Sequence, residues 1–317
     1  MSISAKNYAA QAQAGLREWA KRANESHAKD AKAVMDVSEQ IGIAVHFALP
    51  DNGRILGDGL KGLKGLDLRL PYPSITVEYY VNEKASFNSE MQLRSPKRLA
   101  FAFDIPKEMF DDDLDFCDGG IIIFAANYIS SEYGDGWFPV PMGVAIPRRW
   151  DGFEGLKMFP GISQSEEGKK AFAFTPIPLC HQVTDDIIKK HGAEKGALYA
   201  IKDVQDEAIA VLELCEAISC SNVDSEVVET IDQRKNERRI RQGKLPLYET
   251  RRLVIKAPLT RSAGNSAGGV SDRQGPREHL RRGHIRRLQD GRRVWVQSCV
   301  VGNRENGVIN KSYGVTT

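Results

Sequence analysis

Seven arginines fall within seventeen residues near the end of this 317-residue chain, between Arg277 and Arg293. A guanidinium group holds a phosphate through two parallel hydrogen bonds, and so many cations in one short segment repel one another unless an anion relieves them. Trp295 follows the cluster, and an aromatic ring can stack on an unpaired base. The segment therefore predicts a contact with nucleic acid, RNA preferred, through Arg277, His279, Arg281, Arg282, His284, Arg286, Arg287, Arg292, Arg293 and Trp295.

Two histidines inside this cluster allow a second chemistry. A metal-independent ribonuclease needs a base, an acid and cations around the phosphate, and His279, His284 and Tyr313 are the candidate catalytic residues. The two histidines are five residues apart, so on one strand they occupy opposite faces unless Gly283 introduces a bulge. Whether the protein is an enzyme is therefore left open, and binding without catalysis is the favoured interpretation.

The Asp290-Gly291 pair stands between two β-prone runs, which predicts a tight hairpin. Alternation along its strands leaves neither face purely apolar, because Arg286 falls on one face of the first strand and Arg287 falls on the other. Trp295 is then either part of a small core, the commoner role of a tryptophan, or a platform for a partner.

The net charge of +2 hides a division within the chain. From Arg234 to Lys311 there are 20 Lys and Arg against 6 Asp and Glu, a balance of +14, while the rest of the chain carries −12. The basic part is suited to an anionic partner. An intramolecular contact between the two parts would also satisfy these charges, so that alternative stays open.

Helical periodicity marks the first forty residues, with a break at Asn24-Glu25-Ser26. It returns after Cys180 and predicts further helices over Asp185–His191, Ile201–Ile218 and Ser225–Gln242. Short β-type runs predict strands at Ile43–Leu49, Ser74–Val81, Leu99–Phe103, Gly120–Ala126, Phe138–Ile146, Ala171–Phe174 and Tyr248–Lys256.

Long helices are missing between most of these runs, which argues against a βαβ array. The fold class that we expect is α+β, with a mainly antiparallel sheet, packing helices and a small basic β-hairpin module at the C-terminus. The expected domains are N-terminal helices over 1–40, an α+β main domain over 41–256, a flexible linker over 257–275 and the basic C-terminal β module over 276–317.

Weaker motifs favour ordinary structural roles. The glycines of Gly57–Gly62 have dinucleotide-loop spacing but lead into prolines, and Asp111–Asp118 lacks the spaced ligands of a calcium loop. We therefore expect no cofactor and no metal. His46, on an apolar strand, is predicted to be a hydrogen-bonded core histidine.

Five scattered cysteines with no CxxC pair predict reduced thiols. The chain shows no secretory leader and no apolar run of the length that spans a membrane. We expect a cytoplasmic protein with no membrane partner.

The C-terminal pattern resembles a group of uncharacterised phage and prophage proteins of proteobacteria. The residues that carry the resemblance are Arg277-Glu278-His279, Arg281-Arg282-Gly283-His284-Ile285-Arg286, Val294-Trp295-Val296 and Val300-Val301-Gly302, with looser likeness at Leu70–Pro73 and Gly243–Leu247. The resemblance implies a viral accessory role inside a host cell and transfers no catalytic assignment.

Three hypotheses follow. The first is a phage-derived accessory protein that binds nucleic acid through its basic C-terminal module. The second is a metal-independent ribonuclease or toxin-like nuclease. The third is an inhibitory factor that binds a host protein, with the basic tail held against its own acidic part.

Overall fold

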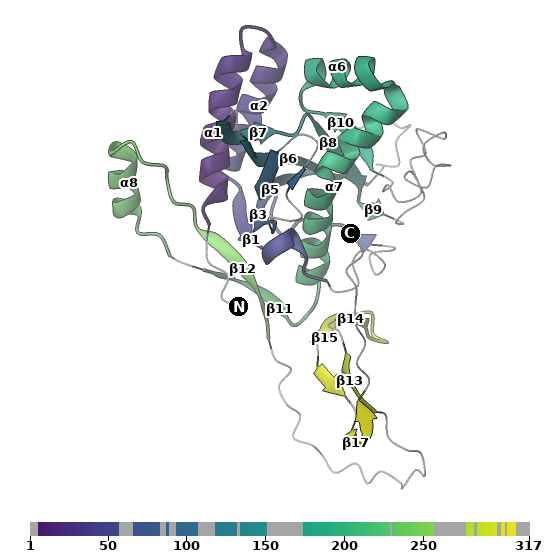
Figure 1. The fold of residues 1–317 in the computed structure, drawn as a ribbon. Coiled ribbons are helices and arrows are strands. Elements are labelled where there is room, and N and C mark those ends of the chain that lie inside the picture. The colour runs from purple at the N-terminus through teal and green to yellow at the C-terminus, as the bar shows by residue number, and fades with distance from the viewer. Residues whose placement is uncertain are drawn as a thin grey trace.

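A computed structural model describes residues 6–56, 66–82, 87–88, 93–106, 118–131, 134–150, 174–228, 230–256, 277–281, 284–296, 299–301 and 303–308. Within these ranges, a broad sheet lies between two layers of helices (Figure 1). The helices are α1 Tyr8–Ala23, α2 Ala28–Ile41, α6 His181–His191, α7 Ala193–Ile218 and α8 Gln233–Arg241, with a short 3-10 turn at Asp51–Gly53.

The main sheet has ten strands, ordered β10-β8-β6-β5-β3-β1-β12-β11, with β4 beside β5 and β7 beside β6. Strand β1 pairs in parallel with β3 and with β12, and the other strand pairs of this sheet are antiparallel. The strands are β1 Val45–Ala48, β3 Ser74–Tyr80, β4 Phe87–Asn88, β5 Leu93–Ile105, β6 Gly120–Ser131, β7 Gly134–Pro139, β8 Met142–Pro147, β10 Thr175–Pro178, β11 Val223–Val227 and β12 Thr250–Ile255.

The expected α+β class with a mainly antiparallel sheet is confirmed. Smaller pairs lie outside the main sheet: β2 Leu66–Asp67 with β9 Arg149–Trp150, and β14 His284–Arg287 with β15 Arg293–Val296. A further three-stranded sheet contains β13 Arg277–Arg281, β16 Cys299–Val301 and β17 Asn303–Val308.

Both faces of the main sheet are buried, because alternate residues of each central strand enter different cores. On β5, Ala100 and Ala102 pack with α7, while Leu99 and Phe101 pack with α1 and α2. The isoleucines of β6 divide in the same way. A sheet covered on both faces needs apolar residues at nearly every position, which explains the continuous apolar runs in the sequence.

Buried carboxylates fix two helix beginnings. Glu78 on β3 accepts hydrogen bonds from the backbone N–H groups of Lys6, Tyr8 and Ala9, at the start of α1. Asp30 on α2 accepts from the N–H groups of Gln182 and Val183 at the start of α6. The first N–H groups of a helix have no partner within the helix. Glu78 therefore ties α1 to the sheet, and Asp30 ties α6 to α2.

Two predicted elements are wrong in part. Ser225–Gln242 is not one helix, because residues of β11 pair with β12 and α8 begins only where the Asp232 side chain accepts from the N–H groups of Arg234 and Lys235. Phe138–Ile146 is two strands, since Pro141 has no N–H to continue a ladder.

The N-terminal helices and their break are confirmed, as is the long helix at Ile201–Ile218 that packs on the sheet. His46 is buried, with its Nδ1 2.6 Å from the Thr76 hydroxyl and its ring stacked on Tyr248. Four predicted segments lie wholly or mostly outside the described residues: the Gly57–Gly62 loop, the 257–275 linker, Ala171–Phe174 except Phe174, and Asp111–Asp118 except Asp118.

None of the helices described is long and apolar enough to cross a membrane. The side chains of Cys180, Cys215 and Cys220 are buried and form no disulfide.

Candidate nucleic-acid interface

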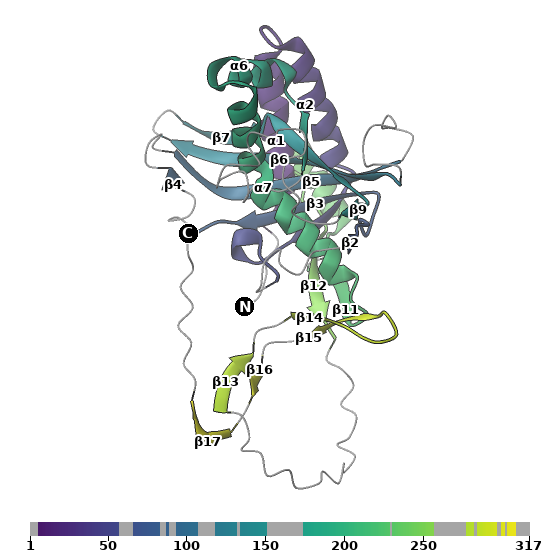
Figure 2. The ribbon, with the colours of Figure 1, turned by 90° about the vertical axis from the view of Figure 1, so that its right-hand side faces the viewer.

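A hollow of about 440 Å³ opens where the β14–β15 hairpin meets the end of α7. Three arginines line it: Arg69, from the segment before β3, and Arg292 and Arg293 from the hairpin. Its apolar side includes Cys215 and Ile218 of α7. We call this hollow the arginine groove, and Figure 2 shows the hairpin beside the lower end of α7.

A second hollow of about 340 Å³ adjoins the groove through Arg69, which lines both. Its other lining residues are Asp118, Arg148 and Arg149. Arg149 is 82% exposed and pairs with Asp118, while Arg148 donates to the backbone oxygens of Asp118 and Leu68 and so holds this corner together. The two hollows therefore form one surface with arginines from three distant parts of the chain.

The hairpin is fixed to the body by its second strand. The N–H and carbonyl of Trp295 exchange hydrogen bonds with the Asn222 side chain, at 2.7 and 2.8 Å. The N–H of Ser221 donates to the carbonyl of Arg293 at 2.9 Å. These contacts act like a short extra strand pairing, so the arginines of the hairpin have a defined position beside Arg69.

Two of the groove arginines also face carboxylates. Arg293 pairs with Glu216 at 2.5 Å, and Arg292 pairs with Asp290 in the turn at 2.7 Å. Burial raises the pKa of Glu216, and the charges of Arg293 and Arg287 oppose that shift. Arg292 and Arg293 are thus partly neutralised, and Arg286 and Arg287 are exposed on the same hairpin.

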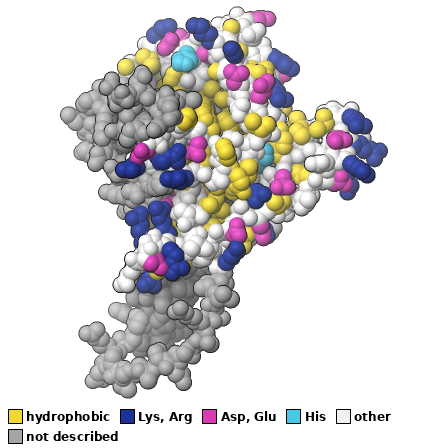
Figure 3. Space-filling model, turned by 180° about the vertical axis from the view of Figure 1, so that it is seen from behind, with side chains coloured by type: hydrophobic (Ala, Val, Ile, Leu, Met, Phe, Trp, Pro, Cys, Tyr) yellow, Lys and Arg dark blue, Asp and Glu magenta, His cyan; other side chains and the backbone are white. Residues whose placement is uncertain are grey.

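The face seen in Figure 3 carries Lys and Arg side chains near the hairpin at its lower left and on α8 at its right. Apolar side chains occupy much of the surface between these two areas. Lys and Arg side chains also lie along the upper edge of this face, so the hairpin and α8 are two of several basic areas on it.

The structure brings only part of the predicted interface together. The side chains of Arg286, Arg287, Arg292 and Arg293 are described on one hairpin, whose Asp290-Gly291 turn has Gly291 at φ 81°. His284 is half-buried on the same hairpin. Outside the described side chains lie Arg277, His279, Arg281, Arg282 and Tyr313, so the proposed catalytic set stays a prediction.

Trp295 lines an apolar cavity of about 230 Å³ between α7, β12 and the hairpin. Ala217, Val223 and Leu253 lie around the same cavity, and Trp295 is half-buried. This position suits a packing role for the ring in anchoring the hairpin.

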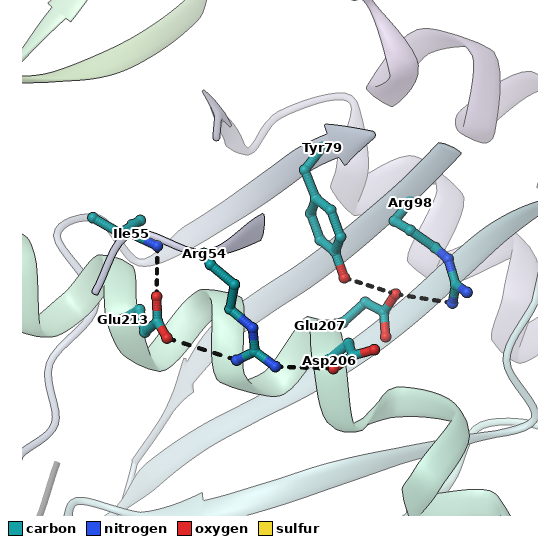
Figure 4. Close-up of polar contacts among 7 residues, drawn as sticks. All are labelled: Arg54, Ile55, Tyr79, Arg98, Asp206, Glu207 and Glu213. Carbon is teal, nitrogen blue, oxygen red and sulfur yellow. Dashed lines mark hydrogen bonds and ion pairs between the residues drawn. The ribbon is translucent and has the colours of Figure 1, made fainter. Parts of the chain in front are cut away.

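A separate set of charged residues lies between α7 and the sheet (Figure 4). Glu207 is fully buried, and its Oε1 accepts from the Tyr79 hydroxyl at 3.0 Å and from Arg98 at 3.3 Å. Burial raises the pKa of Glu207, while the Arg98 charge opposes the shift. Among the described residues its Oε2 has no hydrogen-bond partner.

Glu213, two turns further along α7, accepts the N–H groups of Ile55 and Leu56 at 2.6 and 2.9 Å (Figure 4). Arg54 bridges Glu213 and Asp206. These contacts attach α7 to β3, β5 and the segment after β1. We interpret the network as the polar part of the interface between α7 and the sheet.

Sequence reasoning missed Arg69, Arg148 and Arg149. Arg69 stands between Leu68 and Leu70, both buried, and this apolar alternation was the available signal for an outward-facing arginine. Nothing in the spacing indicated that it would meet the C-terminal hairpin.

No group of metal-ligating side chains occurs among the residues that the structure describes. Comparisons with protein-family models, with curated proteins and with solved structures found no match to this chain.

Proposed function

We propose that the protein is a phage-derived accessory protein that binds nucleic acid, with RNA as the preferred partner, in the cytoplasm of a host cell. The observation that carries the proposal is the arginine groove. Arg69, Arg292 and Arg293 converge there from distant parts of the chain, and Arg286 and Arg287 extend the positive surface along the hairpin.

Phosphate is the ligand that this chemistry favours. Arginine forks hold phosphate oxygens in a bidentate way, and the docked hairpin presents them without first having to be ordered. The carboxylates of Glu216 and Asp290 orient two of the guanidinium groups and leave other donors of each fork available to an anion. The preference for RNA rests on the sequence pattern, since the half-buried Trp295 lends it no support from base stacking.

The test is a binding titration of the full chain with a labelled single-stranded RNA of about 30 nucleotides, repeated over a range of salt concentrations. Duplex DNA of the same length measures the preference for RNA. The groove variant combines Arg69→Gln, Arg286→Gln and Arg287→Gln. The matched control combines Lys189→Gln, Lys190→Gln and Lys195→Gln, which removes the same charge from exposed positions around α6.

Wild-type affinity should fall steeply with salt, because each phosphate contact releases counterions. The groove variant should bind about tenfold or more weakly and lose about 2 from the slope of log affinity against log salt, while the control binds like the wild type. Absent binding, salt-insensitive binding or equal losses in both variants would reject the proposal.

One contact favours a second candidate, an inhibitory factor whose basic tail is held intramolecularly. Arg293 already pairs with Glu216 of the protein's own helix. Under this alternative the chain captures a host protein from lysate equally well with and without nuclease treatment, and it shows no affinity for purified RNA.

A further inference from the structure

Helix α8 stands apart from the rest of the described protein. It joins β11 to β12 and projects from the end of these strands, at the left of Figure 1. None of its nine residues is buried. A helix gains most of its stability from packing an apolar face, so an unpacked helix of this length needs another reason to persist.

Local contacts hold α8 in place. The Asp232 side chain caps its beginning, and the Asn236 side chain exchanges two hydrogen bonds with the backbone of Leu247 on the returning segment. Arg239 donates to the carbonyl of Leu245. The returning segment is itself tied to Asn7, which bonds the Pro246 carbonyl and the Tyr248 N–H. The projection is therefore an ordered arm.

The arm is strongly basic on one side. At 100° per residue, the five cations of α8 fall within a sector of about 160°, and Asn236 and Ile240 lie outside it. Lys244 follows just beyond the helix. The basic residues are Arg234, Lys235, Arg238, Arg239, Arg241 and Lys244. Arg241 pairs with Glu237, and within the described part of the chain no carboxylate pairs with the other five.

We propose that α8 is a second nucleic-acid contact, separate from the arginine groove, that binds the phosphates of the sugar–phosphate backbone. Arg234, Arg238 and Arg241 form a stripe about 10 Å long, which matches the axial length of about three phosphates on one strand. The proposal rests on the proposed function in one respect: the ligand is the same nucleic acid.

Charge and shape distinguish this partner from a membrane surface. A helix that lies in a membrane interface buries a wide apolar face, whereas α8 offers only Ile240, with Leu245 and Leu247 nearby on the returning segment. Arginine dominates the basic side, and its planar fork matches a phosphate diester that is held in a regular array. Helix α8 and the β14–β15 hairpin, which lines the groove, lie on different sides of the molecule in Figure 1, so one long strand can contact both without the two sites competing.

The test compares three variants of the full chain with the wild type, using the same single-stranded RNA and range of salt concentrations. The arm variant combines Arg234→Gln, Lys235→Gln and Arg238→Gln. The groove variant is the one described above, and a third variant carries all six changes. The triple change at Lys189, Lys190 and Lys195 is again the charge control, and circular dichroism checks that each variant is folded.

The arm variant should lose about tenfold in affinity and about 2 from the salt slope, and its loss should add to that of the groove variant in the six-fold variant. An arm variant that binds like the wild type overturns the α8 proposal while leaving the groove intact. Loss in the arm variant with no loss in the groove variant supports α8 and rejects the groove.

Two further outcomes would also overturn the α8 proposal. One is a six-fold variant that binds no more weakly than the groove variant alone. The other is loss of binding to vesicles of anionic phospholipid with no change in RNA binding, which would assign α8 to membranes.

Discussion

At the scale of single residues, burial decides what each charged group does. Three glutamates of α7 are buried against the sheet or the hairpin, and burial raises the pKa of Glu207, Glu213 and Glu216 alike. Of the hairpin arginines, Arg286, Arg287 and Arg292 are instead exposed, while Arg293 is half-buried and pairs with Glu216. The same helix therefore carries structural acids along its length and one side of the proposed interface at its end.

Glu207→Gln should flatten the pH dependence of stability. A carboxyl whose folded pKa is raised stabilises the fold below its unfolded value, near 4.5, and that contribution is lost as pH rises through the raised pKa. The amide keeps an acceptor for Tyr79 and carries no charge. As pH rises above the unfolded pKa near 4.5, the free energy of unfolding should fall less in the variant than in the wild type. Urea titrations measure it, and equal slopes would contradict the assignment.

His46 should remain neutral through the physiological range, because burial lowers its pKa to about 4. A lowered pKa changes the stability of the fold with pH in the opposite direction. The folded state resists protonation, so this contribution to stability is present above the unfolded value near 6.5 and is lost as pH falls toward 4. Nuclear magnetic resonance of the imidazole nitrogens checks this. A midpoint near 6.5 in the folded protein would show that the ring is not buried as described.

Residue types alone predicted His46 correctly, because a histidine on an apolar strand has few other roles. They did not predict the buried glutamates of α7. Glu207 and Glu213 lie on a helix whose apolar stripe was visible in the sequence, but their partners Tyr79, Arg98 and Arg54 are far away along the chain. Only the folded sheet brings these groups within hydrogen-bonding distance.

At the scale of elements, the hairpin is positioned by a few polar contacts. Its strands were predictable from the Asp290-Gly291 turn, since a tight turn is a local feature. Its docking on Asn222 and Glu216 was not, because the contacts join segments more than seventy residues apart. The periodicity of the sequence predicted a helix from Ser225, whereas α8 begins at Gln233. The residues before it include β11, whose side chains alternate between half-buried and exposed positions.

Asn222→Ala should loosen the hairpin without unfolding the protein. The change removes both hydrogen bonds to the backbone of Trp295, so its amide should exchange with solvent about tenfold faster, as expected for losing a contact of about 1.4 kcal/mol. Affinity for RNA should fall with it, because Arg292 and Arg293 no longer have a fixed place beside Arg69.

Asn236→Ala is the matched control for this prediction. It removes an equivalent pair of bonds to Leu247, on the α8 arm. Hydrogen exchange followed by mass spectrometry should show acceleration at 293–296 in the first variant and near 247 in the second. Faster exchange at both places in both variants would mean that the two elements are not independent.

At the scale of the whole molecule, the sheet brings together what the sequence separates. The spacing of the predicted strands indicated a mainly antiparallel sheet. It did not indicate the two parallel pairs of β1, because parallel strands depend on long connections. The connection from β1 to β3 carries Arg69, and the segment after β8 carries Arg149, to the corner where the C-terminal hairpin docks. The excess of basic residues does lie in the C-terminal part of the chain. The proposed interface nevertheless takes arginines from both the basic and the acidic parts.

The central claim is that nucleic acid lies in the arginine groove, and ultraviolet crosslinking of the full chain to a single-stranded RNA tests it most directly. Crosslinked peptides are identified by mass spectrometry after digestion of the RNA and the protein. The account predicts crosslinks in the peptides around Arg69 and in the hairpin from His284 to Val296, and their loss in the groove variant. Crosslinks confined to α1, α2 and α6 would contradict it.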